Sequence, residues 1–244
     1  MGVIYEPTGA VREYADLALN LYSGCEHGCI YCYAPNATFK NREVFHNKVH
    51  LKDNIIKRLE KDLKNITKKN KFEKKLVLMS FTCDPYQPAE ETNGVTRDAI
   101  QLLNDHEFPT RILTKGGDLS QRDMDLLSQF PGNEFGVSLT LLDKDDQLKW
   151  EPKAAEPMQR IENLKVAKGM GIKTWLSLEP IIDIDQAIEV INETQEFTDH
   201  YGVGKLNYNS HQKTINWVSA RERIIAKFEE LEKDHTIHAT LLDA

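Results

Sequence analysis

Three of the four cysteines in this chain fall within eight residues, as Cys25, Cys29 and Cys32 in the spacing C-x3-C-x2-C. Cysteine thiolates, usually four of them, hold iron–sulfur clusters in proteins. Three thiolates this close can bind three irons of a [4Fe–4S] cluster and leave the fourth iron without a protein ligand. We therefore expect a cluster that does chemistry at its open iron, rather than one that only carries electrons.

Two other interpretations of the cysteine motif have to be weighed. A structural zinc site could use the three cysteines with His27 or His46 as the fourth ligand. His27 lies between Cys25 and Cys29, so the loop would have to fold sharply to use all four groups. A disulfide framework is disfavoured because the chain is long, has few cysteines and carries no secretory signal. The motif thus favours an iron–sulfur cluster over zinc or unliganded thiols.

The composition is that of an ordinary globular protein, with 244 residues, 40% hydrophobic, 28% charged and a net charge of −7. The apolar runs are shorter than the roughly 20 residues that span a bilayer. With reduced cysteines, this predicts a cytoplasmic protein with no membrane partner. The acidic balance argues against tight non-specific binding to duplex DNA. The lysines between positions 57 and 75 are interpreted as the solvated face of an amphipathic helix.

Apolar runs of strand length alternate with helix-period segments along the chain. The expected strands are 17–22, 76–81, 110–114, 135–140, 174–178 and 201–206. The expected helices are 50–68, 94–106, 119–129, 155–170, 184–195 and 217–233. Nearly continuous apolar strands indicate a parallel sheet buried on both faces. Repeated βα units predict an α/β fold, either an open sheet or a barrel, and six units favour a partial (β/α)6 TIM-like barrel. The tail at 236–242 is expected to be a short strand or an end cap.

Polar residues follow the expected strands at their carboxyl ends, where the functional sites of α/β proteins gather. In chain order these clusters are 25–32, 80–90, 114–117, 138–140, 177–180 and 205–207. Core packing does not explain so many polar clusters at one edge. We therefore expect one cavity at this edge of the sheet, lined by all of these polar clusters.

The cysteine motif, followed by the aromatic Tyr33 and opening a βα-repeat chain, resembles the radical S-adenosylmethionine (SAM) superfamily. In that family three cysteines hold a [4Fe–4S] cluster, and the amino and carboxylate groups of SAM chelate the fourth iron. The resemblance implies that SAM is cleaved reductively to methionine and a 5′-deoxyadenosyl radical, which abstracts hydrogen from a substrate. It also implies one domain over 1–244, with a core over 15–210 and a C-terminal helix and tail over 211–244.

Further motifs resemble the branch that includes spore photoproduct lyase, often labelled DNA-repair-photolyase-like. They are Asp84-Pro-Tyr-Gln-Pro-x-Glu90, Thr114-Lys115, Ser138-Leu-Thr140 and Ser177-Leu-Glu179-Pro180. By this resemblance, Lys115 would pair with the SAM carboxylate and Ser138 would hydrogen-bond SAM. A lysine at a strand end is a mobile point charge suited to a carboxylate. Glu179 would grip the SAM ribose or the substrate.

The same resemblance assigns the residues around the methionyl and adenine groups of SAM. Thr82 and Asp84 would lie along the methionyl group, and Tyr31 and Tyr33 would lie near the adenine. Cys83, the fourth cysteine, lies between Thr82 and Asp84 in the sequence. Spore photoproduct lyase uses a separate cysteine as hydrogen donor, a few residues before the matching aspartate. Cys83 is therefore either a catalytic hydrogen donor or a small buried thiol at a strand end.

The chain is shorter than spore photoproduct lyase and acidic, so the resemblance transfers the SAM chemistry but not thymine-dimer repair. The substrate is expected to be a nucleobase or nucleotide, and an electron donor such as flavodoxin or ferredoxin is implied. The alternative is a non-catalytic, zinc-stabilised module that binds nucleic acid or protein. Lys115 and Ser138 at strand ends argue against that module, because a structural zinc has no use for a carboxylate clamp.

A few other residues remain open. The polar residues that could contact a substrate are Glu90, Arg97, Lys205, Asn207 and His211. Of these, Arg97 is more readily interpreted as a helix-surface residue and His211 as a solvated loop residue. Trp150 is expected in a lid loop over 143–155, and Trp217 is expected to pack the last helix.

Overall fold

The computed structural model describes residues 2–68 and 75–243. Within them, eight strands form one sheet in the order β1-β2-β5-β6-β7-β8-β9-β10, with every pair parallel except the antiparallel β1–β2 pair. The strands are β1 (Ile4–Tyr5), β2 (Leu17–Leu19), β5 (Val77–Met79), β6 (Thr110–Thr114), β7 (Glu134–Ser138), β8 (Lys173–Ile181), β9 (His200–Lys205) and β10 (Asp234–Ile237). A separate antiparallel pair joins β3 (Tyr22–Ser23) to β4 (His50–Leu51).

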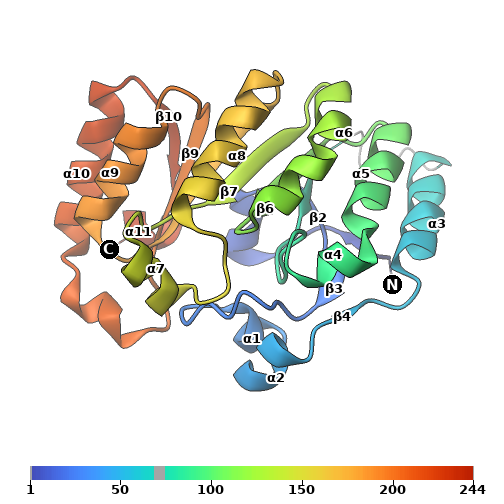
Figure 1. Cartoon of the computed structure of the whole chain (residues 1–244), viewed down its shortest axis with the longest axis horizontal. Coiled ribbons are helices and arrows are strands. Elements are labelled where there is room, and N and C mark those ends of the chain that lie inside the picture. The colour runs from blue at the N-terminus through green and yellow to red at the C-terminus, as the bar shows by residue number, and fades with distance from the viewer. Residues whose placement is uncertain (1, 69–74, 244) are drawn as a thin grey trace.

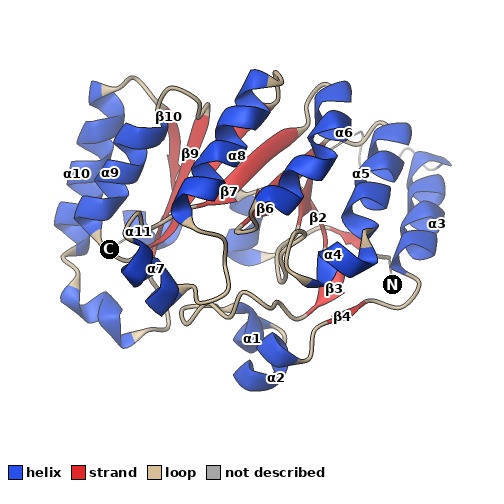
Figure 2. Cartoon of the chain, viewed as in Figure 1, coloured by secondary structure: helices blue, strands red, loops and turns tan. Residues whose placement is uncertain are grey.

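Helices follow most of the strands and cover one face of the sheet (Figures 1 and 2). The α-helices are α1 (Ala34–Ala37), α2 (Arg42–Asn47), α3 (Ile55–Lys68), α4 (Ala89–Asn93), α5 (Val95–Asp105), α6 (Met124–Gln129), α7 (Lys144–Trp150), α8 (Pro157–Gly169), α9 (Ile184–Thr194), α10 (Trp217–Glu230) and α11 (Ala239–Leu242). The 3-10 helices are η1 (Gly9–Glu13), η2 (Asp118–Asp123) and η3 (Ser210–Thr214). No helix in the described ranges is both long and apolar enough to cross a membrane.

The strands are held together by a buried apolar core between the sheet and the helices. Leu17, Val77, Ile112, Phe135 and Leu176 have no exposed surface, and each belongs to a different neighbouring strand. Because the ladder is parallel, the carboxyl ends of these strands lie at the same edge of the sheet. That edge carries the short helices α1, α2, α4 and α7, at the bottom of Figure 1.

The predicted partial barrel is confirmed, and the six predicted strands are present, the one over 110–114 with the predicted bounds and the others with shifted ends. Three expectations need correction. The segment expected to be one strand over 17–22 is broken into β2 and β3, and the helix expected from 50 begins at Ile55 because His50–Leu51 forms β4. The expected lid loop over 143–155 contains α7, whose first turn is capped by Asp143 accepting the N–H of Asp146. In the tail, both a strand (β10) and a capping helix (α11) form.

Side-chain caps begin the helices α9 and α10. The side chain of Asp183 accepts the N–H of Gln186, and Asn216 accepts the N–H of Ser219. Such caps satisfy backbone donors that have no partner inside the helix. Of the lysines between 57 and 75, those at 69–74 lie outside the described residues, and those at 57, 61 and 64 are exposed on the outer face of α3.

Candidate active site

A cavity of about 370 Å³ opens at the carboxyl edge of the sheet. It is lined by every residue that the sequence singled out for the cluster, SAM or hydrogen donation. These residues are Cys25, Cys29, Tyr31, Cys32, Tyr33, Thr82, Cys83, Asp84, Lys115, Ser138 and Glu179. They come from the loops after β3, β5 and β6 and from the ends of β7 and β8, so the topology brings together groups that are up to 154 positions apart in the sequence.

The cysteine loop is fixed by the start of α2. The Arg42 guanidinium donates to the carbonyl oxygens of Cys29 and Cys32, at 3.1 and 2.6 Å. On the other side, the Cys25 N–H donates to the Phe45 carbonyl at 3.2 Å, and His46 Nδ1 lies 2.8 Å from the Cys25 carbonyl. Backbone contacts thus set the shape of the loop and leave the sulfur atoms free to face the cavity.

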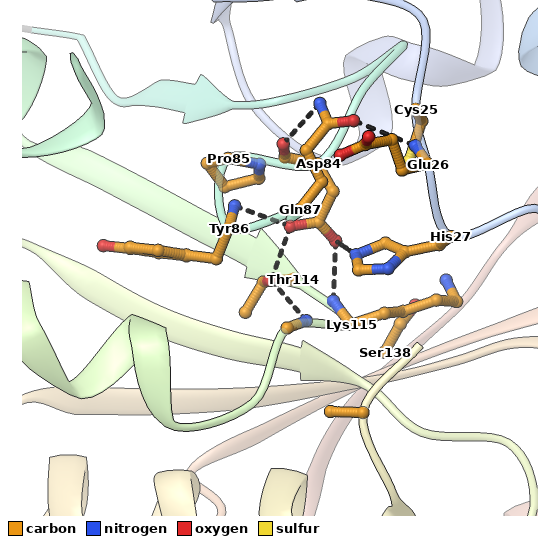
Figure 3. A network of polar contacts seen from close by, with 12 residues as sticks. Cys25, Glu26, His27, Asp84, Pro85, Tyr86, Gln87, Thr114, Lys115 and Ser138 are labelled. Atoms are coloured by element: carbon orange, nitrogen blue, oxygen red, sulfur yellow. Dashed lines mark hydrogen bonds and ion pairs between the residues drawn. The ribbon is translucent and has the colours of Figure 1, made fainter. Parts of the chain in front are cut away.

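The segment after β5 clamps the same loop from the opposite side (Figure 3). Gln87 is fully buried; its side-chain oxygen accepts the N–H of Glu26 at 2.9 Å, and its amide nitrogen donates to the Gly24 carbonyl at 3.4 Å. The Glu26 carboxylate in turn accepts the N–H of Ala89 at 2.6 Å. Gly24 is required here, because its φ is +97° and a Cβ would lie 2.5 Å from the Phe45 carbonyl oxygen.

Asp84 joins three parts of the site (Figure 3). Its carboxylate accepts hydrogen bonds from Thr114 Oγ1 at 2.6 Å and the Lys115 N–H at 2.7 Å, both at the end of β6. It also accepts the N–H of Tyr86 at 2.8 Å and lies 3.1 Å from His27 Nε2, inside the cysteine motif. Burial alone would raise the pKa of Asp84, but these partners outweigh it and lower the pKa to about 2. The ionised carboxylate therefore holds the cysteine loop against β6.

The three thiols fit an iron–sulfur cluster by their chemistry. Burial raises the pKa of Cys25, Cys29 and Cys32, that of Cys29 to about 12 despite the nearby charge of Lys115. Thiols in such surroundings ionise only when a metal binds the sulfur and displaces the proton. Three soft sulfur donors on one short loop, facing one cavity, are the donor set of an iron–sulfur cluster.

The zinc interpretation finds no support in the positions of the two histidines. His27 pairs with Asp84 through Nε2, and its Nδ1 lies 3.1 Å from the Lys153 carbonyl. His46 Nδ1 faces the Cys25 carbonyl. Among the described residues, no group of three or more His, Cys, Asp or Glu side chains is placed to hold a single metal ion.

A buried ion pair supports the wall formed by Tyr31, Lys115 and Ser138. Arg160 and Glu151 have essentially no exposed side-chain surface, and Arg160 Nη2 lies 2.6 Å from Glu151 Oε2. The Tyr31 hydroxyl donates to the same Glu151 carboxylate, and Arg160 Nη1 donates to the Ser138 carbonyl at 2.8 Å. Lys115 Nζ lies 5.6 Å from the centre of the Tyr31 ring, close enough for a cation–π contact. This network fixes the expected SAM-binding groups relative to each other.

Asn20 shapes the opposite wall. Its side-chain oxygen accepts the N–H groups of Phe81 and Thr82, at 2.8 and 2.7 Å, and lies 4.0 Å from the Cys83 sulfur. The Tyr33 hydroxyl donates to the Phe81 carbonyl at 2.7 Å. Cys83 is half-buried and lines the cavity.

Two of the charged residues left open for a substrate have structural partners instead. Glu90 is fully buried and accepts hydrogen bonds from the Tyr22 hydroxyl at 2.5 Å and from Arg122 at 2.7 Å. Arg97 makes a two-pronged ion pair with Asp125 on the surface, as its surface interpretation predicted. Neither residue lines the cavity, and both are better explained by packing of η2 and α6 against α4 and α5.

The residues after β9 are divided between the cavity and its surroundings. Lys205 and Asn207 line the cavity. His211 does not; its Nε2 lies 3.1 Å from the Ile182 carbonyl, and its ring packs edge-on against Trp150. Lys205 Nζ lies 5.3 Å from the centre of the Trp217 ring.

Several residues that shape the site were not identified from the sequence. They are Glu13, Asn20, Glu151, Arg160 and His238. Asn20 carried a signal in its own position, since it interrupts an apolar run directly at a strand end. The others lie on helices or in the two terminal segments, where a polar residue is most often solvent-exposed.

The model of the Radical SAM superfamily matches residues 19–197 of the chain. An uncharacterized protein of Methanocaldococcus jannaschii is 31% identical over 201 residues, which cover 82% of this chain and 73% of that protein. An uncharacterized protein of Acidianus two-tailed virus is 29% identical over 198 residues, covering 78% of this chain and 64% of that protein. The chain thus spans under two thirds of the viral relative.

Two kinds of solved structure share the fold. Spore photoproduct lyase complexed with dinucleoside spore photoproduct superimposes with a TM-score of 0.72 at 12% identity, covering 95% of this chain and 78% of the other. Streptococcus suis SuiB bound to S-adenosylmethionine superimposes with a TM-score of 0.66 at 14% identity, covering 90% of this chain but 46% of the other. The expected likeness to spore photoproduct lyase is therefore confirmed for the fold. With the match over 19–197, the chain belongs to the radical SAM superfamily.

Proposed function

We propose that this chain is an enzyme that binds a [4Fe–4S] cluster through Cys25, Cys29 and Cys32, with SAM beside it. When bound, the cluster supplies the electron that cleaves SAM to methionine and a 5′-deoxyadenosyl radical, the species that abstracts hydrogen from a substrate. The observation that carries this proposal is that the three cysteines share one cavity with Lys115 and Ser138.

The chain's own residues have distinct tasks in this proposal. Lys115 supplies positive charge for the SAM carboxylate, and the Ser138 side chain supplies a hydrogen bond. Tyr31 and Tyr33 offer ring surfaces to the adenine, and both rings are fixed by hydrogen bonds from their hydroxyl groups. Because these groups are fixed before SAM binds, little ordering entropy opposes binding.

We further propose that the substrate is a nucleobase or nucleotide. Beyond the expected SAM-binding groups, the cavity wall carries the aromatic side chains Tyr14, Phe81 and Tyr208. Stacking on aromatic side chains contributes about 1–3 kcal/mol per base. A neighbour in fold, spore photoproduct lyase, is complexed with a dinucleoside, whereas another, SuiB, binds a precursor peptide. A low-potential donor such as flavodoxin or ferredoxin would supply the electron in the cytoplasm.

The test is anaerobic reconstitution with iron and sulfide, followed by dithionite and SAM. We expect a brown protein that releases 5′-deoxyadenosine, and a Cys29→Ala variant that binds no intact cluster. Cys83→Ala is the matched control, because it removes the remaining cysteine and should retain the full cluster. A colourless protein that holds zinc and never cleaves SAM would overturn the proposal. Dinucleotides and short peptides added separately should then show which class stimulates 5′-deoxyadenosine release.

A further inference from the structure

Strand β9 carries glycine at two positions whose missing side chains leave room for groups from other strands. A Cβ on Gly204 would lie 2.4 Å from the carboxyl carbon of Glu179, on β8. A Cβ on Gly202 would lie 3.2 Å from His238 Nε2, in the segment after β10. Neither glycine has the positive φ that would explain it by backbone conformation. The sequence Tyr-Gly-Val-Gly-Lys therefore makes space for a carboxyl group and an imidazole.

The imidazole connects two carboxyl groups. His238 Nδ1 lies 2.7 Å from Glu13 Oε2, and its Nε2 lies 3.9 Å from Glu179 Oε2. The His238 side chain is only 6% exposed, and within the described residues Nε2 has no hydrogen-bond partner. The ring is held by stacking on Tyr14, with centres 4.5 Å apart. A buried polar atom without a partner is rare and calls for an explanation.

The two ends of this chain of groups face different surroundings. Glu179 lines the cavity. The Glu13 side chain is 30% exposed and belongs to η1 in the N-terminal segment. The series Glu179, His238, Glu13 therefore leads from the cavity wall to solvent.

We propose that these three residues form a proton relay that serves the substrate, with Glu179 as the catalytic acid–base and His238 and Glu13 as positioning residues that exchange its proton with solvent. This rests on the proposed function, and it narrows the substrate class. A hydrogen-atom abstraction by itself needs no proton path. The relay points to a substrate whose reacting C–H lies beside an ionisable O–H or N–H group.

The proton balance is simple and involves no electrons. The substrate O–H or N–H bond breaks and its proton passes to a Glu179 carboxylate oxygen. Glu179 passes that proton to His238 Nε2, while the Nδ1–H proton passes to the Glu13 carboxylate and then to water. The reverse order returns a proton to the product and restores the starting imidazole. The relay requires the 3.9 Å gap between His238 Nε2 and Glu179 Oε2 to close when substrate binds, as catalytic contacts often tighten only in the substrate complex.

The charges around the relay suit proton exchange near neutral pH. Burial, and then the charge of Glu13, raise the pKa of Glu179 to about 7. Burial lowers the pKa of His238; the hydrogen bond to Glu13 and the charge of Glu13 oppose it, and the charges of His200 and Arg111 add a smaller lowering. With its pKa below the ordinary value, we expect His238 to be neutral at pH 7, and the Glu13 carboxylate oxygen 2.7 Å from Nδ1 favours the proton on that nitrogen.

Two measurements on the full chain without cluster test the relay. Because neither measurement needs SAM cleavage, a negative result would refute the relay without bearing on the proposed function. The first is nitrogen NMR of histidine-labelled protein, with the His238 signals assigned by His238→Gln. At pH 7 we expect a neutral ring with the proton on Nδ1. His235→Gln is the matched control, because His235 also stacks on an aromatic ring, that of Phe228, but its Nδ1 faces the Lys233 carbonyl instead of a carboxyl group. A cationic His238, or a proton on Nε2, overturns the relay.

The second measurement is infrared titration of the buried carboxyl band, assigned by its loss in Glu179→Gln. We expect a midpoint near pH 7 that moves to lower pH in Glu13→Gln, because the second negative charge is gone. A midpoint near 4, typical of an ordinary glutamate, or one that Glu13→Gln leaves unchanged, overturns the proposal. If Glu179→Gln does not fold, the shift in midpoint between wild type and Glu13→Gln still tests the relay.

Discussion

Replacing Asp84 with asparagine removes the charge that ties the cysteine loop to β6 and keeps the size of the side chain. In the folded chain the carboxylate accepts hydrogen bonds from Thr114 and from the N–H groups of Tyr86 and Lys115. An amide offers one acceptor oxygen, and its NH2 group would face a donor. We therefore expect Asp84→Asn to destabilise the fold even before a cluster binds.

The size of the effect follows from the carboxyl pKa. The pKa falls from 3.8 to about 2 on folding, and each pKa unit corresponds to about 1.4 kcal/mol. Asp84 thus contributes roughly 2.5 kcal/mol at neutral pH, with its side chain only 9% exposed. Since the folded pKa is the lower one, this contribution is present above pH 4 and is lost as the pH falls towards 2.

Urea unfolding of the chain without cluster, followed by circular dichroism, measures this difference. The gap in unfolding free energy between wild type and Asp84→Asn should be roughly 2.5 kcal/mol at pH 7 and 5, and smaller at pH 3.5. Asp53→Asn is the control, because Asp53 is exposed and its replacement should change stability by less than about 0.5 kcal/mol. A gap no larger than that of the control, or one that is equal at all three pH values, would refute the reasoning.

Three further variants test other parts of the structure. Glu151→Gln should cost about 3–5 kcal/mol of unfolding free energy, because it leaves the buried Arg160 charge uncompensated, and adding Arg160→Met should recover much of that loss in the same urea assay. Gly204→Ala should cost about 1–3 kcal/mol and displace Glu179, seen as loss of its neutral-pH carboxyl band. Asn216→Ala should cost about 1 kcal/mol in thermal unfolding, because it removes the N-cap of α10; an unchanged midpoint would contradict that role.

Much of the fold could be predicted because the apolar pattern and the tertiary structure agree. Continuous apolar runs such as Leu-Val-Leu-Met at 76–79 form central strands that are buried along their length, so the apolar pattern alone identified them. The strand β1 was missed, because two residues at a sheet edge carry too little pattern to identify. The helix α7 was missed because its sequence, Lys-Asp-Asp-Gln-Leu-Lys-Trp, is mostly charged, and it is held by a cap and by the buried Trp150.

The positions of the expected site residues were predictable for a different reason. Parallel strands place their carboxyl ends together, so a list of polar residues at strand ends is already a list of neighbours. This logic brought Lys115 and Ser138 to the cysteine loop. It did not predict that the Asp84 carboxylate would accept hydrogen bonds from so many groups of the protein itself. The number of donors around a carboxylate depends on the path of the loop backbone, which the apolar pattern of the sequence does not reveal.

Two of the relay residues, Glu13 and His238, could not be predicted from polar residues at strand ends. Glu13 and His238 are 225 positions apart and lie in terminal segments whose elements are too short to be recognised by pattern. A signal was present in another form, since β9, with the sequence His-Tyr-Gly-Val-Gly-Lys, carries glycine at the alternate positions 202 and 204. Glycine inside a strand weakens it and marks a close approach by another group. A pair of glycines on one face of a barrel strand therefore predicts that side chains from neighbouring segments come close to the strand there, and in this chain those side chains are the carboxyl group of Glu179 and the imidazole of His238.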